Sequence, residues 1–202
     1  LFHAQGQAQM QLRCKAIEAL TYIGVAVGRD KFHRDAMDLL NFYMSLHSSG
    51  QKLSSDDDAE EYMMRALARI CSVLGREFAP CLPLVVPPLL ETVAKMPVTK
   101  AIKLSDNVTE ADLRRPDDDA ENPIARLRAS TEKVLDAIED KTIALSMLAS
   151  FVTELKDLFF PYTRATIRAI APFLHFQQSE EVQQHVICLF PDLVQAAVAA
   201  HV

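Results

Sequence analysis

The sequence predicts an all-α fold, an α-solenoid of about three and a half antiparallel helix pairs with one long acidic insertion. Apolar residues recur at steps of three and four along most of the 202-residue chain, which holds only five glycines. A junction of the type Gly-Arg-acid-Phe occurs twice, 47 residues apart, at Gly28 and at Gly75. Self-similarity at a period of 40 to 50 residues indicates stacked helix pairs.

The first pair is expected at residues 10–47. Apolar positions along residues 10–27 form one helical face, and Gly28 is a natural C-terminal stop. The second helix is expected from Lys31 to about residue 47, with a polar stripe opposite its apolar face. This stripe consists of Arg34, Asp38, Asn41 and Ser45.

The second pair is expected at residues 55–95. Ser55 suits the N-cap of its first helix, which runs to Gly75. Pro83 suits the first turn of its second helix, because a proline there leaves no amide unsatisfied. Pro87 and Pro88 lie further along that helix, where we expect a kink or an interruption.

The remaining repeats are expected at residues 140–176 and 180–202, the last contributing only its first helix. Between them and the second pair lies the insertion, residues 97–139, whose part from residue 105 to Pro123 is polar and acidic and is expected to be a loop. Residues 124–138 fit a helix that fuses with the following one. A short hairpin over residues 126–134 is the alternative, and we expect the helix.

The net charge of −6 is concentrated in two connecting segments. Residues 51–61 carry −4 and residues 105–122 carry −5, so the rest of the chain is net +3. This distribution argues against general nucleic-acid binding, which requires a basic face. Local acidic clusters attract basic partners instead.

Enzymatic chemistry is not predicted. The six histidines lack the spacing of a helical metal site, and no nucleophile elbow, phosphate loop or dinucleotide motif occurs. No cofactor, metal site, signal peptide or membrane insertion is expected. The four cysteines are expected to be buried, reduced thiols. The aromatic residues expected in the core and between repeats are Tyr22, Phe32, Tyr43, Phe78 and Phe159.

Several short stretches spread over residues 12–197 resemble, in their order and spacing, those of one protein family. They are Ile17-Glu18, Ile23-Gly24-Val25-Ala26-Val27-Gly28, Asp56-Asp57-Asp58, Tyr62-Met63, Ala66, Ala68-Arg69-Ile70-Cys71, Leu74-Gly75-Arg76-Glu77-Phe78, Leu82-Pro83, Glu139-Asp140-Lys141-Thr142, Glu154-Leu155-Lys156 and Pro172-Phe173-Leu174-His175-Phe176. Together they resemble the karyopherin-β (importin-β) nuclear transport receptors, the importin beta-3 branch above all. The repeat length agrees with the HEAT class of helix pair. The resemblance implies a segment past the middle of a receptor several times longer.

The resemblance also implies a function. It implies a nuclear import receptor that shuttles between cytoplasm and nucleus, binds cargo with basic signals such as ribosomal proteins, and contacts Ran-GTP and nucleoporins. The second helices would line its concave wall, which makes Asp38, Asn41 and Glu91 candidate partner contacts, together with Asp117, Asp118 and Asp119 in the insertion. The alternative is a cytosolic HEAT scaffold subunit of a phosphatase or signalling complex.

Two features depart from the family pattern. The aromatic residues expected after Asp117–Asp119 are missing, which puts a hairpin there in doubt. Gln183 or Gln184 stands where a HEAT first helix usually carries a basic residue, so the last repeat is atypical.

Overall fold

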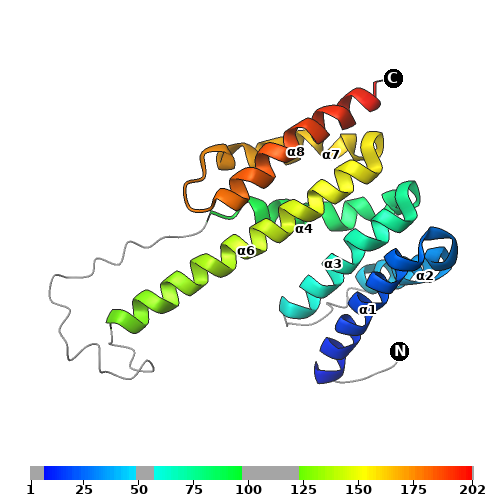
Figure 1. Ribbon diagram of the computed structural model, residues 1–202, viewed down its shortest axis with the longest axis horizontal. Helices are drawn as coiled ribbons and strands as arrows, with labels where there is room; N and C mark the ends of the chain where they lie inside the picture. Colours follow the sequence, from blue (N-terminus) through cyan, green and yellow to red (C-terminus); the bar gives the residue numbers. More distant parts are fainter. Residues whose placement is uncertain (1–6, 49–56, 97–122, 202) are drawn as a thin grey trace.

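The computed structural model describes residues 7–48, 57–96 and 123–201, and every regular element in these ranges is helical (Figure 1). The predicted all-α fold is confirmed. The α-helices are α1 (Gln7–Val27), α2 (Arg29–Ser48), α3 (Asp57–Leu74), α4 (Leu82–Ala94), α6 (Pro123–Leu155), α7 (Phe160–Ile170) and α8 (Glu180–Ala199). Short 3-10 helices join some of them: η1 (Gly75–Cys81), η2 (Lys156–Phe159) and η3 (Ala171–His175).

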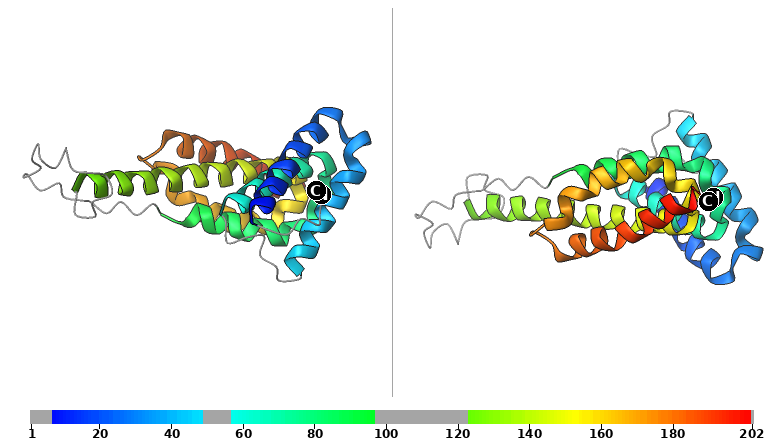
Figure 2. Two further views of the ribbon diagram at one scale, coloured as in Figure 1. Left: turned by 90° about the horizontal axis from the view of Figure 1, so that it is seen from below. Right: turned by 90° about the horizontal axis from the view of Figure 1, so that it is seen from above.

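The helices form two layers (Figures 1 and 2). Helices α1, α3, α6 and α8 lie side by side in the front layer, and each packs against the next. Helices α2, α4 and α7 lie behind them, with α4 packed against both α6 and α7. This arrangement confirms the predicted solenoid, since each apolar face is buried against neighbouring pairs. The division of the chain into individual repeats remains a prediction.

The turns between paired helices share one backbone feature. Gly28, Gly75 and Lys156 each follow the last residue of a front-layer helix, and their φ angles are 83°, 57° and 47°. A residue with this left-handed conformation ends a helix, and glycine adopts it without steric cost. The two predicted glycine stops are therefore confirmed. The third turn forces the same conformation on a lysine.

The phenylalanine of each junction is buried, as predicted for Phe32, Phe78 and Phe159. Phe78 stacks on Phe151 of α6, with ring centroids 5.3 Å apart, and so joins the second pair to the third. Phe32 packs on Gly24, where an added Cβ would lie 2.2 Å from the ring. Glycine at position 24 is thus required for the close approach of α1 and α2.

Ion pairs connect successive junctions. Arg29 Nη2 lies 2.6 Å from Glu77 Oε1, and His33 Nε2 lies 2.8 Å from Glu77 Oε2. Arg76 in turn donates from Nη1 and Nη2 to the two oxygens of Asp157, at 2.6 and 3.0 Å. The hydrogen bond with His33, with Arg29 nearby, lowers the pKa of Glu77, and the Arg76 guanidinium lowers the pKa of Asp157. The Gly-Arg-acid-Phe junction therefore also pairs one repeat with the next.

The structure decides between the alternatives left open for the insertion. Helix α6 is continuous from Pro123 to Leu155, so the helix over residues 124–138 is confirmed and the hairpin is wrong. Most side chains from Arg128 to Glu139 are exposed, and the first half of the helix extends beyond the other helices in Figure 1. The acidic residues 105–122 lie outside the described ranges.

Prolines lie inside α4 and directly after α7. Helix α4 is not interrupted at Pro87 and Pro88. The carbonyl groups that lose a backbone donor are those of Pro83 and Leu84, an exposed and a half-buried residue, so both can be hydrated. The second helix of the repeat expected at residues 140–176, by contrast, does not continue to the end of that range. It ends at Ile170, and η3 follows with Pro172 in its first turn.

Tyr22 and Cys188 were expected to be buried, but both are exposed. Tyr22 is 57% exposed, and its ring lies 3.6 Å from the Arg69 guanidinium, so it joins α1 to α3 at the surface instead of inside the core. Cys71 and Cys81 are buried free thiols, as predicted, but Cys188 is exposed on α8.

Residues Tyr62–Ala94 contain a window apolar enough to span a membrane by length and composition, with a mean hydropathy of 1.3. This run is not one helix, because Gly75 turns it into α3 and α4. Half of the window is buried within the protein, and the 13 residues of α4 span only about 20 Å. The apolar character of the run is therefore accounted for by the core of the solenoid.

Candidate functional site

The predicted partner contacts on the second helices are accessible. Asp38 and Asn41 are exposed on α2, four and seven residues after Arg34 in the same exposed stripe, and Glu91 is exposed on α4. The remaining candidates, Asp117, Asp118 and Asp119, lie outside the described residues. No measurement on this chain tests a contact role for any of these residues, so that role stays a prediction.

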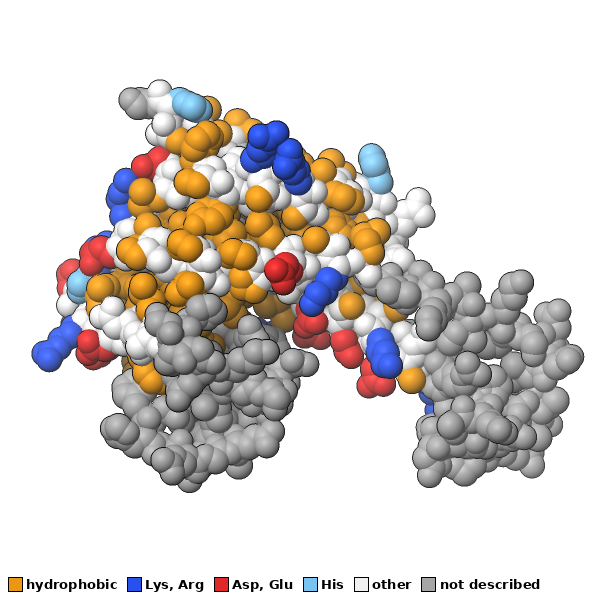
Figure 3. All heavy atoms as spheres, turned by 180° about the vertical axis from the view of Figure 1, so that it is seen from behind, with side chains coloured by type: hydrophobic (Ala, Val, Ile, Leu, Met, Phe, Trp, Pro, Cys, Tyr) orange, Lys and Arg blue, Asp and Glu red, His pale blue; other side chains and the backbone are white. Residues whose placement is uncertain are grey.

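The packing separates the candidates into two groups. Helix α2 packs against α1 and α3, whereas α4 packs against α6 and α7. Asp38 and Asn41 therefore belong to a different packing unit from Glu91. Figure 3 views the layer of second helices from behind and shows an extensive apolar surface with only scattered charged side chains. Asp38, Asn41 and Glu91 are all exposed, so their electrostatic interactions are screened by solvent and salt.

A buried lysine fixes the end of α4, the helix that carries Glu91. Lys141 of α6 is fully buried, and its Nζ donates to the carbonyl oxygens of Thr92 at 3.3 Å, Lys95 at 2.7 Å and Val93. The same Nζ lies 4.2 Å from the ring centroid of Phe173 in η3. The last carbonyl groups of a helix have no partner within the helix, and a cation there also interacts favourably with the helix dipole.

Burial lowers the pKa of Lys141 to about 8, so the ammonium group is still charged at neutral pH. One side chain thus holds together α4, α6 and η3. Sequence analysis missed this role, because a lysine next to Glu139 and Asp140 is typical of an exposed helical surface. Only its place in the apolar series of α6, with Ala144, Leu145 and Leu148, hints at burial.

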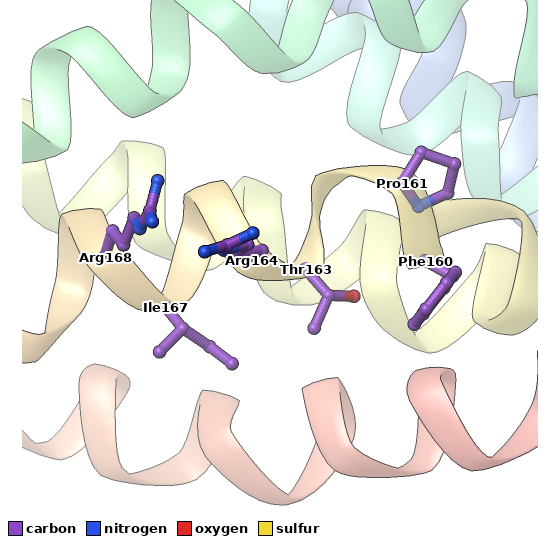
Figure 4. A pocket seen from close by; sticks show the side chains of 6 residues that line it. All are labelled: Phe160, Pro161, Thr163, Arg164, Ile167 and Arg168. Carbon is purple, nitrogen blue, oxygen red and sulfur yellow. The ribbon is translucent and has the colours of Figure 1, made fainter.

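Helix α7 carries a pocket of about 570 Å³ that the sequence did not reveal (Figure 4). All of its lining residues belong to this helix: Phe160, Pro161, Thr163, Arg164, Ile167 and Arg168. In Figure 4, Phe160, Thr163 and Ile167 point toward α8, and the two arginines lie above them in this view. The pocket therefore has an apolar row next to a cationic pair.

The orientation of α7 follows from its buried side. Thr166 is buried, and its hydroxyl donates to the Tyr162 carbonyl at 2.9 Å, while Ile170 is fully buried at the end of the helix. Because residues four apart share one side of a helix, this packing leaves Arg164 and Arg168 together on the exposed side. In the sequence, the pocket is indicated only by two arginines four residues apart on a predicted second helix.

Thr163 differs from the other lining residues. It is 6% exposed, and its Oγ1 has no hydrogen-bond partner within the part of the chain that the structure describes. A buried hydroxyl without a partner costs about 1–3 kcal/mol. A threonine between apolar positions gives no signal of this in the sequence.

Gln183, the departure noted in the last repeat, has a structural role. Its Nε2 donates to the Leu174 carbonyl at 2.6 Å and so ties α8 to η3. Within the described ranges, no group of three or more His, Cys, Asp or Glu side chains is arranged to hold a metal ion.

Helices stacked as pairs in two layers, with repeated ion-paired junctions, define an α-solenoid. No protein-family model matches the chain. It is 34% identical over 191 residues to importin subunit beta-3 of Saccharomyces cerevisiae, a match covering 94% of this chain and 17% of that protein. It is 26% identical to a probable importin-5 homolog of Dictyostelium discoideum, over 91% of this chain and 15% of the relative.

The comparison with solved structures finds the same class of protein. The crystal structure of Kap121p superimposes with a TM-score of 0.70 at 27% identity, covering 95% of this chain and 18% of Kap121p. The chain belongs to the karyopherin-β family, and it spans about a sixth of the length of the curated relatives it matches. Kap121p has also been solved bound to RanGTP, to Nup53p and to Pho4p.

Proposed function

We propose that this chain is part of a nuclear import receptor that binds basic cargo proteins, releases them when Ran-GTP binds, and contacts nucleoporins. The observation that carries the proposal is the 34% identity to importin subunit beta-3 along 94% of the chain. The complexes of Kap121p support the choice of partners. In this function the chain binds and does not catalyse, and the receptor moves between cytoplasm and nucleus.

The test uses the full-length protein that contains this chain. A basic cargo peptide is immobilised, the protein is loaded, and Ran in its GTP form or its GDP form is added. We expect release of the protein by Ran-GTP only, because an import receptor must discharge its cargo in the presence of that form. Failure to retain the basic peptide, or equal release by both forms of Ran, contradicts the proposal.

We further propose that Asp38, Asn41, Glu91 and Asp117–Asp119 contribute to cargo contact through charge and hydrogen bonding. Charge reversal by Asp38→Lys with Glu91→Lys, and separately replacement of Asp117–Asp119 by Ser, should weaken binding of the basic peptide. The loss should be largest at low salt, since exposed charges are screened at high ionic strength. Asp136→Lys, at an exposed position of α6, is the matched control. If the control weakens binding equally, the candidate residues have no specific role.

A further inference from the structure

The pocket on α7 combines charge and apolar surface in a way that the binding of basic cargo does not use. Arg164 and Arg168 are exposed, and within the described part of the chain neither forms an ion pair or a side-chain hydrogen bond. Other arginines do have carboxylate partners, for example Arg29 with Glu77 and Arg76 with Asp157. Like charges four residues apart on a helix repel each other by a few tenths of a kcal/mol. An anionic ligand at this pair relieves that repulsion.

The row beside the arginines is suited to an apolar side chain. Phe160 is 38% exposed although it begins a packed helix, and Ile167 is only partly buried. Both point the same way in Figure 4, with Thr163 between them. Thr163 is buried between them and its Oγ1 is closed to solvent, so this row offers a ligand apolar contact only.

We propose that the α7 pocket binds an acidic peptide segment of a partner protein, with carboxylates on Arg164 and Arg168 and an apolar side chain between Phe160 and Ile167. Guanidinium groups bind carboxylates through two parallel hydrogen bonds, which gives both affinity and orientation. This site selects acidic segments, so it is separate from the proposed binding of basic cargo.

The chemistry favours a peptide over a nucleic acid. Nucleic-acid affinity depends on several phosphate contacts along a basic track, with aromatic side chains for stacking in the case of single strands. Here two arginines lie on a chain of net charge −6, and Phe160 is the one aromatic residue that lines the pocket. A short segment with two acidic residues flanking a leucine or phenylalanine satisfies the pocket fully.

The experiment is a fluorescence anisotropy titration of this chain with a labelled peptide carrying two glutamates four residues apart around a leucine. The same peptide with glutamines in place of the glutamates measures the contribution of charge. We expect at least tenfold weaker binding for the glutamine peptide and for the variant Arg164→Glu/Arg168→Glu. Arg34→Glu, an exposed arginine of α2, should leave the affinity unchanged and serves as the control.

Four outcomes overturn the proposal. Three are no binding of the acidic peptide, equal binding of the glutamine peptide, and equal losses in the Arg164/Arg168 and Arg34 variants. The fourth comes from the same titration with the full-length protein. If the longer protein does not bind the peptide although this chain does, a neighbouring helix fills the pocket and the proposal fails. The substituted arginines are exposed, so circular dichroism should report an unchanged helical fold for these variants.

Discussion

Arg76 and Asp157 form a two-point ion pair that joins the second helix junction to the third, with nitrogen–oxygen distances of 2.6 and 3.0 Å. The pairing is systematic, because Arg29 of the first junction contacts Glu77 of the second in the same direction along the chain. The arginine of one Gly-Arg-acid-Phe unit thus contacts an acid in the next. The junction sequence therefore sets both the end of a helix and the position of the following pair.

A double-mutant cycle over Arg76→Ala and Asp157→Ala should show a favourable but small coupling, because both side chains are exposed. The pKa of Asp157 is lowered in the folded state, so the pair stabilises the fold above the ordinary pKa of an aspartate. This contribution is lost as the pH falls through the folded-state pKa. Urea midpoints at several pH values, at low salt and in 1 M NaCl, measure it. A coupling that salt does not reduce contradicts an ion pair.

Lys156→Gly should stabilise the protein by about 0.5–1 kcal/mol. The lysine holds a φ of 47°, which costs a residue with a Cβ about 1–2 kcal/mol, and glycine offsets part of the gain through its greater freedom when unfolded. The converse change, Gly75→Ala, places a Cβ at a φ of 57° and should destabilise by a similar amount. Urea unfolding measures both. Destabilisation by Lys156→Gly would show that the lysine side chain matters more than its backbone.

Lys141→Met should destabilise the protein by roughly 2 kcal/mol, because it leaves the carbonyl groups at the end of α4 without their donor. Lys133→Met, at an exposed position of the same helix, should change the free energy of unfolding by less than about 0.5 kcal/mol. Chemical unfolding of the three proteins at pH 7 provides the comparison. Equal effects of the two substitutions would exclude a special role for Lys141.

The same lysine predicts a pH dependence. Its pKa is about 8 in the folded protein and 10.5 as the ordinary value, so the unfolded chain holds the proton over this interval. Stability rises with pH wherever the unfolded state binds more protons. Relative to Lys141→Met, the unsubstituted protein should therefore gain stability between pH 8 and 10.5, by at most roughly 3 kcal/mol. A flat or falling difference in unfolding free energy contradicts burial of the charged group.

Thiol reactivity should separate the cysteines. Burial raises the pKa of Cys81 to about 12 and also raises the pKa of Cys71, so neither forms the reactive thiolate near neutral pH. Cys188 is exposed and should react with Ellman's reagent in the folded protein. Cys188→Ser should remove one equivalent from the fast phase, whereas Cys71→Ser should not change that phase. A fast phase that persists unchanged in Cys188→Ser contradicts the exposure.

Most of the fold could be predicted from the conformational preferences of individual residues and their spacing. Gly28 and Gly75 indicate helix ends because few residues other than glycine adopt a left-handed backbone easily. Lys156 gives no such sign, because a lysine is not typical of a left-handed backbone. Residues 124–138 stayed ambiguous because their apolar spacing suits a helix while a nine-residue part of them also suits a hairpin. Pro172 ended α7 earlier than its apolar pattern suggested.

The candidate site was less predictable, for a physical reason. The burial of Lys141 depends on the end of α4 and on Phe173, which lie far from it in sequence and meet it only in the folded solenoid. The unpartnered hydroxyl of Thr163 likewise depends on the packing of α7 beside α8. Tyr22 was expected in the core, but a cation from a neighbouring helix, Arg69, gives its ring a partner at the surface. Such properties arise from tertiary contacts and leave little trace in a local pattern.

Helix α6 has 33 residues, three times the length of its paired helix α7, so it is about 50 Å long. Its later half is packed in the core, where Leu145, Leu148 and Phe151 are fully buried, and its earlier half extends beyond the other described helices (Figure 1). Mechanically, this is a stiff rod held at one end. A sideways force near Pro123 is transmitted as a torque to the interfaces of α6 with α3 and α8. The angle between the second and third helix pairs can therefore be altered from a point far outside the inner face of the solenoid.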